Sequence, residues 1–471
     1  MNWRSVFSSS GPGRDKRVLK DLAKLNSCFV AGFCPTLVGF LPETSFCQAK
    51  DAAGGRGLRQ YAKCNSALQN QIGWFKQPVN INPCCGRRDL FSRPEEPDHR
   101  QQLRESVADF ANREATLAAT RAGLATQAGF SHERWKTMAE LGWTGILVPE
   151  DDGGLAMEHA DLAALHHEAG RAALPEPLVC VGILAMQALV LGGNQALKDR
   201  LLPGLMGGDL LATLAWQGRA GAMGSGAVGP KAAPEGEGWT LSGQALFVPL
   251  AQEAGGYAVA ADTGAGILLA WIDQSPKVVQ TTAHTDGSRQ STVDLDGVKV
   301  DPGAVIAFPD RGAAILDQLL DIARLAVSAQ LQGVMEAAFQ MTLDYMKQRV
   351  QFGKPIASFQ AIQHRAVNLY VHIEMARSAL LRAAAAMDDP HADAASRAAH
   401  VSAAKSRAGD AAQLVVKECI QLHGAIGYTE ECDLSLYVNR ALALAAWLGN
   451  PRAHRARWFE LHNAGGQANG H

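Results

Sequence analysis

The sequence has little net charge and no long apolar run. Its 471 residues include 44 Lys and Arg against 46 Asp and Glu, a formal net charge of −2. A chain so close to neutral has no overall basic field that would attract nucleic acid or an anionic membrane surface. Charged residues, Gly or Pro interrupt every apolar stretch before it reaches the roughly 18 residues that a membrane-spanning helix needs. We therefore expect neither a nucleic-acid partner nor a membrane partner.

Cysteines at metal-binding spacing are also missing. The chain has nine cysteines, but no Cys-x-x-Cys pair, so a structural zinc site is not expected and no metal ligand is assigned. Six of the nine lie within the first 93 residues, no clear signal peptide precedes them, and the other three are far apart: Cys180, Cys419 and Cys432. A disulfide framework of the secreted kind is therefore not expected either.

Apolar residues are plentiful. They make up 47% of the chain, and charged residues make up 19%. This composition can bury a large core and excludes disorder over most of the length. A chain of this length suits about two to four packed units.

The N-terminal segment differs from the rest. The first 93 residues carry 14 Lys and Arg against 5 Asp and Glu, whereas the other 378 carry 30 against 41. We assign residues 1–95 as an atypical extension. Three interpretations are open: an organelle transit segment, a disordered tail, or translation of upstream sequence from a start codon assigned too early. The third is favoured, because Trp, Cys, Phe and Pro are mixed there without any pattern.

Beyond residue 95 the periodicity changes twice. Residues 96–213 show helical spacing, with an amphipathic stripe from Leu103 to Ala119 and further helices predicted over 133–141 and 160–173. Residues 214–308 lose that spacing and predict a compact antiparallel β domain. Its predicted strands cover 239–248 (two strands with a turn at 242–243), 256–261, 266–272, 291–295 and 297–300.

Residues 309–450 return to helical spacing. Long helices are predicted over 313–349, 359–387 and 392–422. Ala dominates these segments, and small side chains let helices approach closely, which favours a helical bundle. The predicted fold class is α+β, mostly α: an N-terminal helical domain, a middle β domain and a C-terminal helical bundle, with residues 451–471 as a tail.

The first motif stands where the first long bundle helix should end. It reads Arg349-Val350-Gln351-Phe352-Gly353-Lys354-Pro355. Proline cannot continue a helix and restricts the residue before it, so the helix is predicted to end at 353–355. Arg349 then lies one turn from that end, and its guanidinium can reach an anionic group. The alternative is an ordinary helix end with a solvated arginine.

The second motif follows the third long helix. It reads Gln421-Leu422-His423-Gly424-Ala425-Ile426-Gly427-Tyr428-Thr429-Glu430-Glu431. A Gly-rich turn frees backbone amides and allows close approach of a phosphate. Thr429 or Asp433 is a candidate N-cap for the next helix. The alternative is an ordinary left-handed helix end.

Together, the two motifs resemble the acyl-CoA dehydrogenase family in wording, in order and in their spacing of 72 residues from Arg349 to Gln421. Residues 142–154 and Leu316-Asp317 with Arg324 resemble the family too, so the resemblance covers roughly residues 96–447. It implies a helical N-domain, a β middle domain and a four-helix C-domain. It also implies FAD, oxidation of an acyl-CoA thioester to the 2-enoyl-CoA, and electron transfer to an electron-transferring flavoprotein.

The resemblance also implies roles for individual residues. FAD in this family is shared across a subunit interface, so a homo- or hetero-oligomer (dimer or tetramer) is expected. The cofactor-binding residues implied are Arg349 and Phe352, against FAD bound mainly to another protomer, and Gln421, Gly424 and Gly427 at its adenine and pyrophosphate end. The substrate-binding residues implied are Arg324 and Tyr428.

The family's catalytic base has no counterpart. The C2 proton next to the thioester is weakly acidic and needs a positioned base. Most of the family has a Glu in a Tyr-Glu-Gly sequence, where this chain has Leu448 within Trp447-Leu448-Gly449. A minority has the Glu just before the helix Arg, where this chain has Ala323. A third position, three residues before Gly333, is Gln330. None of the three takes up a proton, and the catalytic residue stays unknown.

Two functions are therefore open. The chain is a dehydrogenase with an unplaced base, for which Glu430, Glu431 and Asp433 are candidates, or it is a non-catalytic subunit that completes the FAD site of a catalytic mate in a heteromeric enzyme. The family's middle-domain flavin segment survives only in fragments over 215–225, where we predict a flexible loop. A bacterial cytoplasm is the expected location, with the mitochondrial matrix as the alternative if the N-terminal segment is cleaved.

Overall fold

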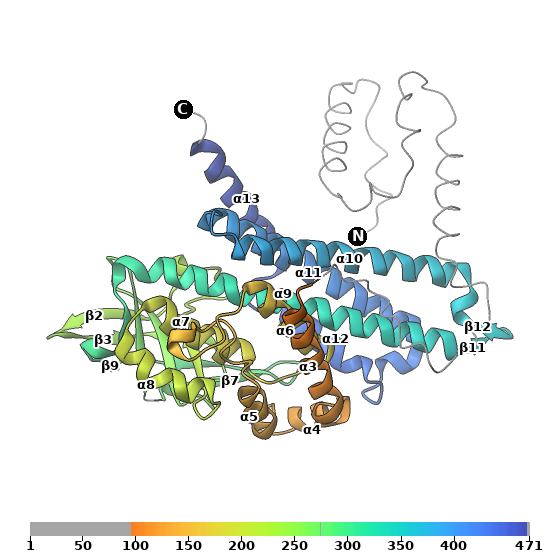
Figure 1. Cartoon of the computed structure of the whole chain (residues 1–471), viewed down its shortest axis with the longest axis horizontal. Coiled ribbons are helices and arrows are strands. Elements are labelled where there is room, and N and C mark those ends of the chain that lie inside the picture. Colours follow the sequence, from red (N-terminus) through yellow and green to blue (C-terminus); the bar gives the residue numbers. More distant parts are fainter. Residues whose placement is uncertain (1–95, 274, 469–471) are drawn as a thin grey trace, which may run out of the picture. The chain divides into compact units, whose positions relative to one another are not determined.

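The computed structural model describes residues 96–273 and 275–468. The N-terminal extension assigned to residues 1–95 lies outside the described residues, so its three interpretations stay predictions. The described part confirms the predicted fold class: helices, then β sheets, then helices again (Figure 1). The domain boundaries themselves also stay predictions.

The first helical region matches the predicted pattern with one break. Its helices are α3 (Asp98–Glu114), α4 (Leu117–Leu124), α5 (His132–Glu140), η4 (Glu150–Asp152), α6 (His159–Arg171), the π-helix η5 (Val179–Ala185), α7 (Met186–Gly192) and α8 (Gln195–Met206). The single helix predicted from Leu103 to Ala119 is wrong. It ends at Glu114, and Thr116 caps the next helix by accepting a hydrogen bond from the Ala119 amide at 3.3 Å. The predicted apolar stripe is confirmed, because Val107 and Phe110 are buried.

The middle region forms two sheets. One has the strand order β10 (Val305–Ala307), β6 (Ile267–Ile272), β5 (Gly256–Asp262), β2 (Lys231–Glu235), β3 (Gly238–Ser242) and β9 (Lys299–Val300), with β1 (Ala212–Ala215) paired to β5. The other has the order β4 (Gln244–Pro249), β8 (Arg289–Asp294) and β7 (Lys277–Ala283). Short 3-10 turns lie at η6 (Ser225–Ala227) and η7 (Pro302–Ala304).

The prediction of a purely antiparallel unit is wrong. Strand β1 pairs with β5 in parallel, and β2 meets β5 in parallel at one position. Strand β1 enters the sheet directly from the helical region, so its direction is set by helix packing and not by a hairpin. All predicted strands are present, but β1, β2, β7 and β10 were missed, because their residues do not alternate between apolar and polar types.

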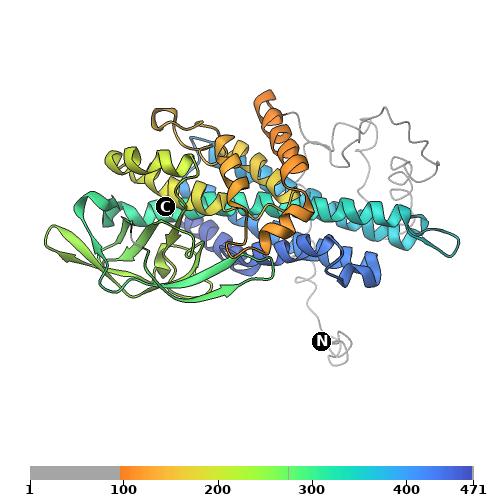
Figure 2. The same ribbon diagram turned by 90° about the horizontal axis from the view of Figure 1, so that it is seen from below.

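The C-terminal region is a helical bundle. Its elements are α9 (Pro309–Gln348), η8 (Ile356–Ser358), α10 (Gln360–Asp388), α11 (Ala394–His423), η9 (Gly424–Tyr428), α12 (Leu434–Ala446) and α13 (Pro451–Ala468). Figure 2 shows α9 running from the sheets at one end to a small hairpin at the other. Within the described ranges, none of the helices has the length and apolarity needed to cross a bilayer.

Helix α9 ends earlier than predicted. Its last residue is Gln348, and Arg349 is already extended. Strands β11 (Val350–Gln351) and β12 (Lys354–Pro355) then form a hairpin whose two turn residues, Phe352 and Gly353, both have positive φ (53° and 79°). This is the signature of a type I′ turn, which joins two antiparallel strands without splaying them. The proline therefore belongs to a hairpin strand and does not itself end the helix.

Residues 451–471 were predicted to be a tail, but residues 451–468 form helix α13. Arg457 on α13 donates to both carboxylate oxygens of Asp321 on α9, at 2.6 and 2.8 Å. His454 is fully buried against the loop that follows α12. The sequence prediction failed because residues 451–463 are mostly polar and mostly exposed, with Pro451 and His454 buried.

Two glycines set the crossing of α6 and α9. A Cβ at Gly333 would overlap the carbonyl oxygen of His167, and a Cβ at Gly170 would overlap that of Gln330. The two backbones are therefore in direct contact, which only glycine permits. This crossing joins the first helical region to the bundle in one apolar core.

A buried ionic cluster lies beside that crossing. His167 Nε2 is 3.1 Å from Glu336 Oε2, and Arg377 lies 2.9 Å from Glu336 Oε1. Burial by itself would lower the pKa of His167, but the carboxylates of Glu336 and Glu168 outweigh burial, and the pKa is raised. Burial would raise the pKa of Glu336, but His167 and Arg377 outweigh it, and the pKa is lowered.

These shifts predict a window of pH in which the cluster is most stabilising. The contribution of His167 to the free energy of unfolding is complete below pH 6.5, the unfolded pKa of this side chain. It is lost as the pH rises through the raised pKa of the folded state. The contribution of Glu336 is complete above pH 4.5, its unfolded pKa, and is lost as the pH falls through the lowered pKa of the folded state. We expect His167→Gln to remove the decline in thermal unfolding midpoint above 6.5, measured over a pH series. Exposed His391→Gln is the control, and an unchanged decline in His167→Gln would contradict the assignment.

Candidate functional site

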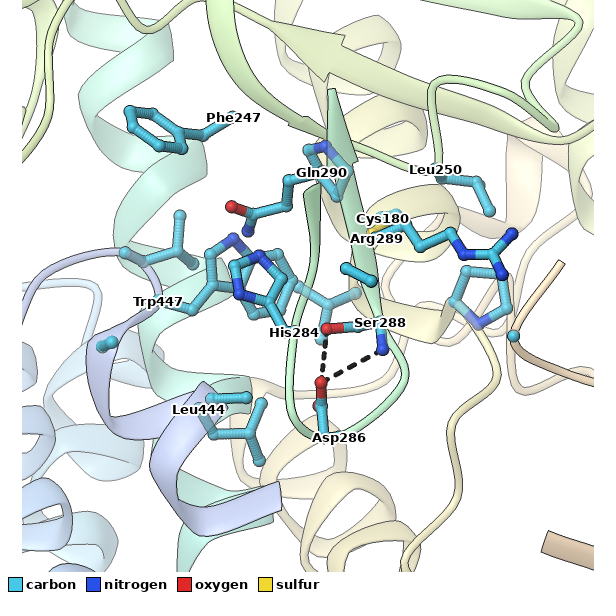
Figure 3. A pocket seen from close by; sticks show the side chains of 18 of the residues that line it. Cys180, Phe247, Leu250, His284, Asp286, Ser288, Arg289, Gln290, Leu444 and Trp447 are labelled. Carbon is cyan, nitrogen blue, oxygen red and sulfur yellow. Dashed lines mark hydrogen bonds between the residues drawn. The ribbon is translucent and has the colours of Figure 1, made fainter. Parts of the chain in front are cut away.

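A cavity of about 670 Å³ lies between the β region and the two helical regions. Strand β4 and the loop after it supply Phe247 and Leu250, the β7–β8 hairpin supplies His284 and Gln290, and the end of α12 supplies Trp447 (Figure 3). Its size and its mainly apolar wall with a few polar groups are typical of a site for a small organic ligand.

Polar side chains in one wall of the cavity form a connected hydrogen-bond network. Arg440 on α12 donates to Asp286 at 2.9 Å and to the Gln330 side-chain oxygen at 3.0 Å. The Gln330 amide lies 3.0 Å from His166 Nδ1. Burial, and then the charge of Arg440, lower the pKa of His166 to about 3, so this histidine is neutral and accepts the amide hydrogen. Asp286 also accepts from the Ser288 hydroxyl and amide, as the dashed lines in Figure 3 show.

Three carboxylates line the cavity, and each has a basic neighbour. Asp286 pairs with Arg440, Glu253 lies 3.7 Å from His132, and Glu176 lies 2.7 Å from Arg134. The second oxygen of Glu176 is buried without a hydrogen-bond partner among the described residues. Burial raises the pKa of the neighbouring Cys180 thiol to about 12, so it is not a nucleophile.

The three positions that the resemblance assigns to the family's base lie in different surroundings. Leu448 lines the cavity, Gln330 lines it as part of the polar network, and Ala323 is fully buried in α9. Leu448 has φ +57° and Gly449 has φ +110°, so the chain turns sharply there. A Cβ at position 449 would lie 2.8 Å from His454 Nε2, which explains the glycine.

Arg324 lies behind this turn, completely buried. Its guanidinium donates to Asp321 at 2.8 Å, to the Leu448 carbonyl at 3.2 Å and to the Met223 carbonyl. It is not among the residues that line the cavity. Its contacts are thus with the protein itself, and the substrate-binding role stays a prediction.

The predicted cofactor-binding residues meet at the far end of the bundle. Tyr345, one turn before Arg349, stacks on His423, with ring centroids 4.5 Å apart. This contact places the β11–β12 hairpin next to the η9 turn. Phe352 and Tyr428 are 92% and 78% exposed there.

The other predicted residues of this end divide into two kinds. Arg349, Gln421 and Gly424 are exposed, and no ion-pair partner of Arg349 occurs within 96–273 and 275–468. Gly424 has φ +70°. Gly427 is buried, and a Cβ there would lie 2.9 Å from the Ile420 carbonyl oxygen. The turn thus needs both glycines, and most of it is exposed.

This end and the cavity of the same chain are separate places. Gln330 lines the cavity, and Arg349 follows it by 19 residues, directly after the end of the same helix, which corresponds to about 28 Å. An arginine side chain does not span that distance. Arg349 and Phe352 therefore face something other than their own cavity.

The remaining candidates are elsewhere. Asp433 does not cap α12 with its side chain, as proposed, because its carboxylate accepts from Arg121 at 3.2 Å. Glu430 and Glu431 are exposed after η9 and are not cavity-lining residues. The segment 215–225 is partly tethered, because the Ser225 amide and hydroxyl donate to Asp317 on α9 at 2.8 and 2.7 Å.

Sequence reasoning did not bring several cavity residues together. His284 and Gln290 come from a hairpin whose first strand, β7, was not predicted. Arg440 and Gln330 are 110 residues apart in sequence, and nothing in either segment signals the other. The only available sign was an arginine in the middle of an otherwise apolar, Ala-rich helix.

Comparison with known proteins agrees with this geometry. Residues 97–209 match the model of the acyl-CoA dehydrogenase N-terminal domain, and residues 310–457 match that of the acyl-CoA dehydrogenase C-terminal domain. Acyl-CoA dehydrogenase IpdE2 of Mycobacterium tuberculosis is 32% identical over 359 residues, which cover 76% of this chain and 95% of IpdE2. The chain belongs to the acyl-CoA dehydrogenase family. Probable acyl-CoA dehydrogenase YngJ of Bacillus subtilis is 30% identical over 70% of the chain and 89% of YngJ.

Solved structures share the fold. A variant of the Tcur3481–Tcur3483 steroid acyl-CoA dehydrogenase has a TM-score of 0.70 and 29% identity, covering 78% of this chain and 99% of that one. Butyryl-CoA dehydrogenase from Megasphaera elsdenii has a TM-score of 0.71 at 22% identity, covering 78% and 99%. PigA with FAD and proline has a TM-score of 0.71 at 22% identity, covering 78% and 98%. FAD, expected from the resemblance, is the cofactor of this family.

The cavity has features that fit a flavin ring. Its wall is mainly apolar, and His284 Nε2 is buried at the cavity without a hydrogen-bond partner in the described part of the chain. An unpaired buried polar atom is costly, so it calls for a polar ligand atom or a water. The residues present are therefore compatible with the family's cofactor.

The Asp286–Arg440 pair is expected to hold this wall together. Both side chains are mostly buried, so Asp286→Asn leaves the Arg440 charge without a counter-charge. We expect a loss of about 3 kcal/mol in the free energy of unfolding, measured by denaturant titration. Asp410→Asn breaks the exposed pair with Arg455 and should cost less than about 1 kcal/mol. Equal losses in both variants would contradict a buried network.

Proposed function

We propose that the chain is the non-catalytic partner subunit of a heteromeric, FAD-dependent acyl-CoA dehydrogenase. It completes the FAD site of a catalytic mate with Arg349, Phe352 and the Gln421–Gly427 turn. The complete enzyme oxidises an acyl-CoA thioester to the 2-enoyl-CoA and passes electrons to an electron-transferring flavoprotein. A cytoplasmic location belongs to this proposal.

The observation that carries the proposal is the side chain at the cavity wall. Leu448 stands on the sharp turn where most of the family has its Glu, and it lines the cavity. The other two base positions, Ala323 and Gln330, are equally unable to take up a proton. The scaffold is intact while the proton acceptor is missing, which is the pattern of a subunit whose chemistry is done by a mate.

The far end of the bundle supports the second half of the proposal. Arg349 offers a guanidinium for a pyrophosphate, Phe352 an exposed ring, and the η9 turn open backbone around Gly424. An aromatic ring and an arginine exposed together at one surface are typical of an interface. The solved steroid acyl-CoA dehydrogenase with 29% identity is named as a pair, Tcur3481–Tcur3483.

The chain's own residues have defined tasks in this proposal. Arg349 neutralises and orients the diphosphate, Phe352 covers an apolar face, and the two glycines of η9 let the backbone approach. FAD, when bound, supplies the acceptor for the hydride from C3 of the acyl group. In the chain's own cavity, Trp447 and Leu448 exclude water, and Arg440 fixes the Gln330 amide.

A second function is supported by one observation. The Glu176 oxygen that lacks a hydrogen-bond partner among the described residues belongs to a cavity-lining side chain. It is a candidate proton acceptor that sequence reasoning did not consider. In that case the chain is a dehydrogenase by itself. Its Arg134 neighbour holds the other oxygen at 2.7 Å.

Purification separates the two functions. We expect the chain alone to bind no more than a trace of flavin and not to respond to acyl-CoA. Co-expressed with a dehydrogenase encoded next to it, it should form a yellow complex whose flavin absorbance bleaches on adding acyl-CoA. A yellow chain that bleaches alone, and no longer does so as Glu176→Gln, would refute the partner-subunit proposal and support the second function.

The interface residue can be tested in the same complex. Arg349→Gln should weaken FAD binding about tenfold or more, because a charge-assisted contact to a diphosphate is lost. The measurement is the FAD dissociation constant of the reconstituted apo-complex. Exposed Arg382→Gln on α10 is the matched control. If both variants bind FAD like the unmodified complex, Arg349 does not contact the cofactor.

A further inference from the structure

A completely buried lysine lies behind the cavity wall. Lys405, in the middle of α11, has no exposed surface. Its Nζ donates to the carbonyl oxygens of Leu444 at 3.0 Å, Ala445 at 3.2 Å and Gly449 at 3.0 Å. An ammonium group has three hydrogens, so these three acceptors use all of them.

The three carbonyls are not an arbitrary set. Leu444 and Ala445 belong to the last turn of α12, where carbonyl oxygens have no partner within the helix and carry the negative end of its dipole. Gly449 lies beyond the sharp turn, on the other side of Leu448. A single ammonium group therefore bridges both ends of the segment Trp447–Gly449, which lines the cavity.

The segment would not keep this shape unaided. Leu448 has φ +57°, a conformation that residues other than glycine avoid. From α9, Arg324 holds the Leu448 carbonyl at 3.2 Å, and from α13, His454 Nε2 lies 3.1 Å from the same oxygen. Lys405 is the group that ties the segment to α11 and closes the turn on its far side.

Burial at this position disfavours the charged form of the Lys405 side chain. Burial, and then the nearby Arg324, lower the pKa of Lys405 to about 7. The charged or titratable groups that interact with Lys405 are Arg324 from α9 and His454 from α13. Arg324 is itself paired with Asp321, which also binds Arg457. Helix α12 contributes backbone oxygens to Lys405. An apolar side chain would pack here without this cost, so the hydrogen bonds to the turn are what the lysine adds.

We propose that Lys405 is a positioning residue for the cavity, whose three hydrogen bonds hold Trp447–Gly449 in the conformation that presents residue 448 to the ligand. The proposal depends on the proposed function only for the identity of the ligand. In this chain the side chain presented is Leu448, so Lys405 preserves the support of a catalytic loop that has lost its base.

The test is hydrogen–deuterium exchange of the peptide that contains Trp447–Gly449, on the purified full chain or its complex. In Lys405→Met, which keeps most of the volume but has no donor, we expect exchange of this peptide to be about tenfold faster, with peptides of α9 and α10 unchanged. Lys417→Met, an exposed position on the same helix, should exchange like the unmodified chain.

Chemical rescue separates hydrogen bonding from packing. Lys405→Ala should lose protection in the same peptide and regain it with propylammonium, but not with sodium at equal ionic strength. The proposal would be overturned if the peptide exchanged at an unchanged rate in Lys405→Met. It would also be overturned if propylammonium and sodium slowed exchange in Lys405→Ala equally. If neither variant folds, exchange is measured on the unmodified chain. Exchange of Trp447–Gly449 as fast as that of the exposed β11–β12 hairpin would overturn the proposal, and slow exchange would support it.

None of these measurements requires flavin or activity. A failure of the partner-subunit proposal is therefore seen separately, in the co-expression experiment.

Discussion

The contact between α6 and α9 is the constraint on which the arrangement depends. Gly170 and Gly333 bring the two backbones together, and α9 then runs 40 residues from the sheets to the β11–β12 hairpin. Three groups of functional interest are placed by this one helix. Gln330 lies in the cavity wall, Arg324 supports the turn after α12, and Arg349 follows the helix end. A rigid helix fixes these three groups relative to one another.

The helix also explains why the chain has two functional ends. The cavity and the exposed end of the bundle are about 28 Å apart along α9, so no side chain serves both. The chain therefore has an exposed surface at the end of the bundle and a separate cavity of its own. The proposed sharing of FAD between two subunits is consistent with this separation.

The cavity wall combines polar groups that are individually unfavourable. Arg324, Lys405 and Arg440 are buried or nearly so, and each is satisfied by carbonyls, an amide or a carboxylate. Such groups stabilise little by themselves, but an incomplete set would leave buried charge. The network therefore specifies one conformation of the turn at Leu448. It is complete around Leu448, the apolar residue at the position that the resemblance assigns to the family's base.

Periodicity in the sequence determined the fold class, the long bundle helices and most strands, because burial of apolar faces imposes spacing that is local. The two Gly-rich motifs determined the family resemblance and the exposed end of the bundle. The sequence did not determine the parallel strand β1 or helix α13, whose partners are distant in the chain. The break after Glu114 was also missed, although the Thr116 cap that marks it is local. Nor did the sequence reveal Lys405, Arg440 or the β7–β8 side of the cavity. Buried hydrogen bonds join residues far apart in sequence, and only the tertiary structure decides which of them meet.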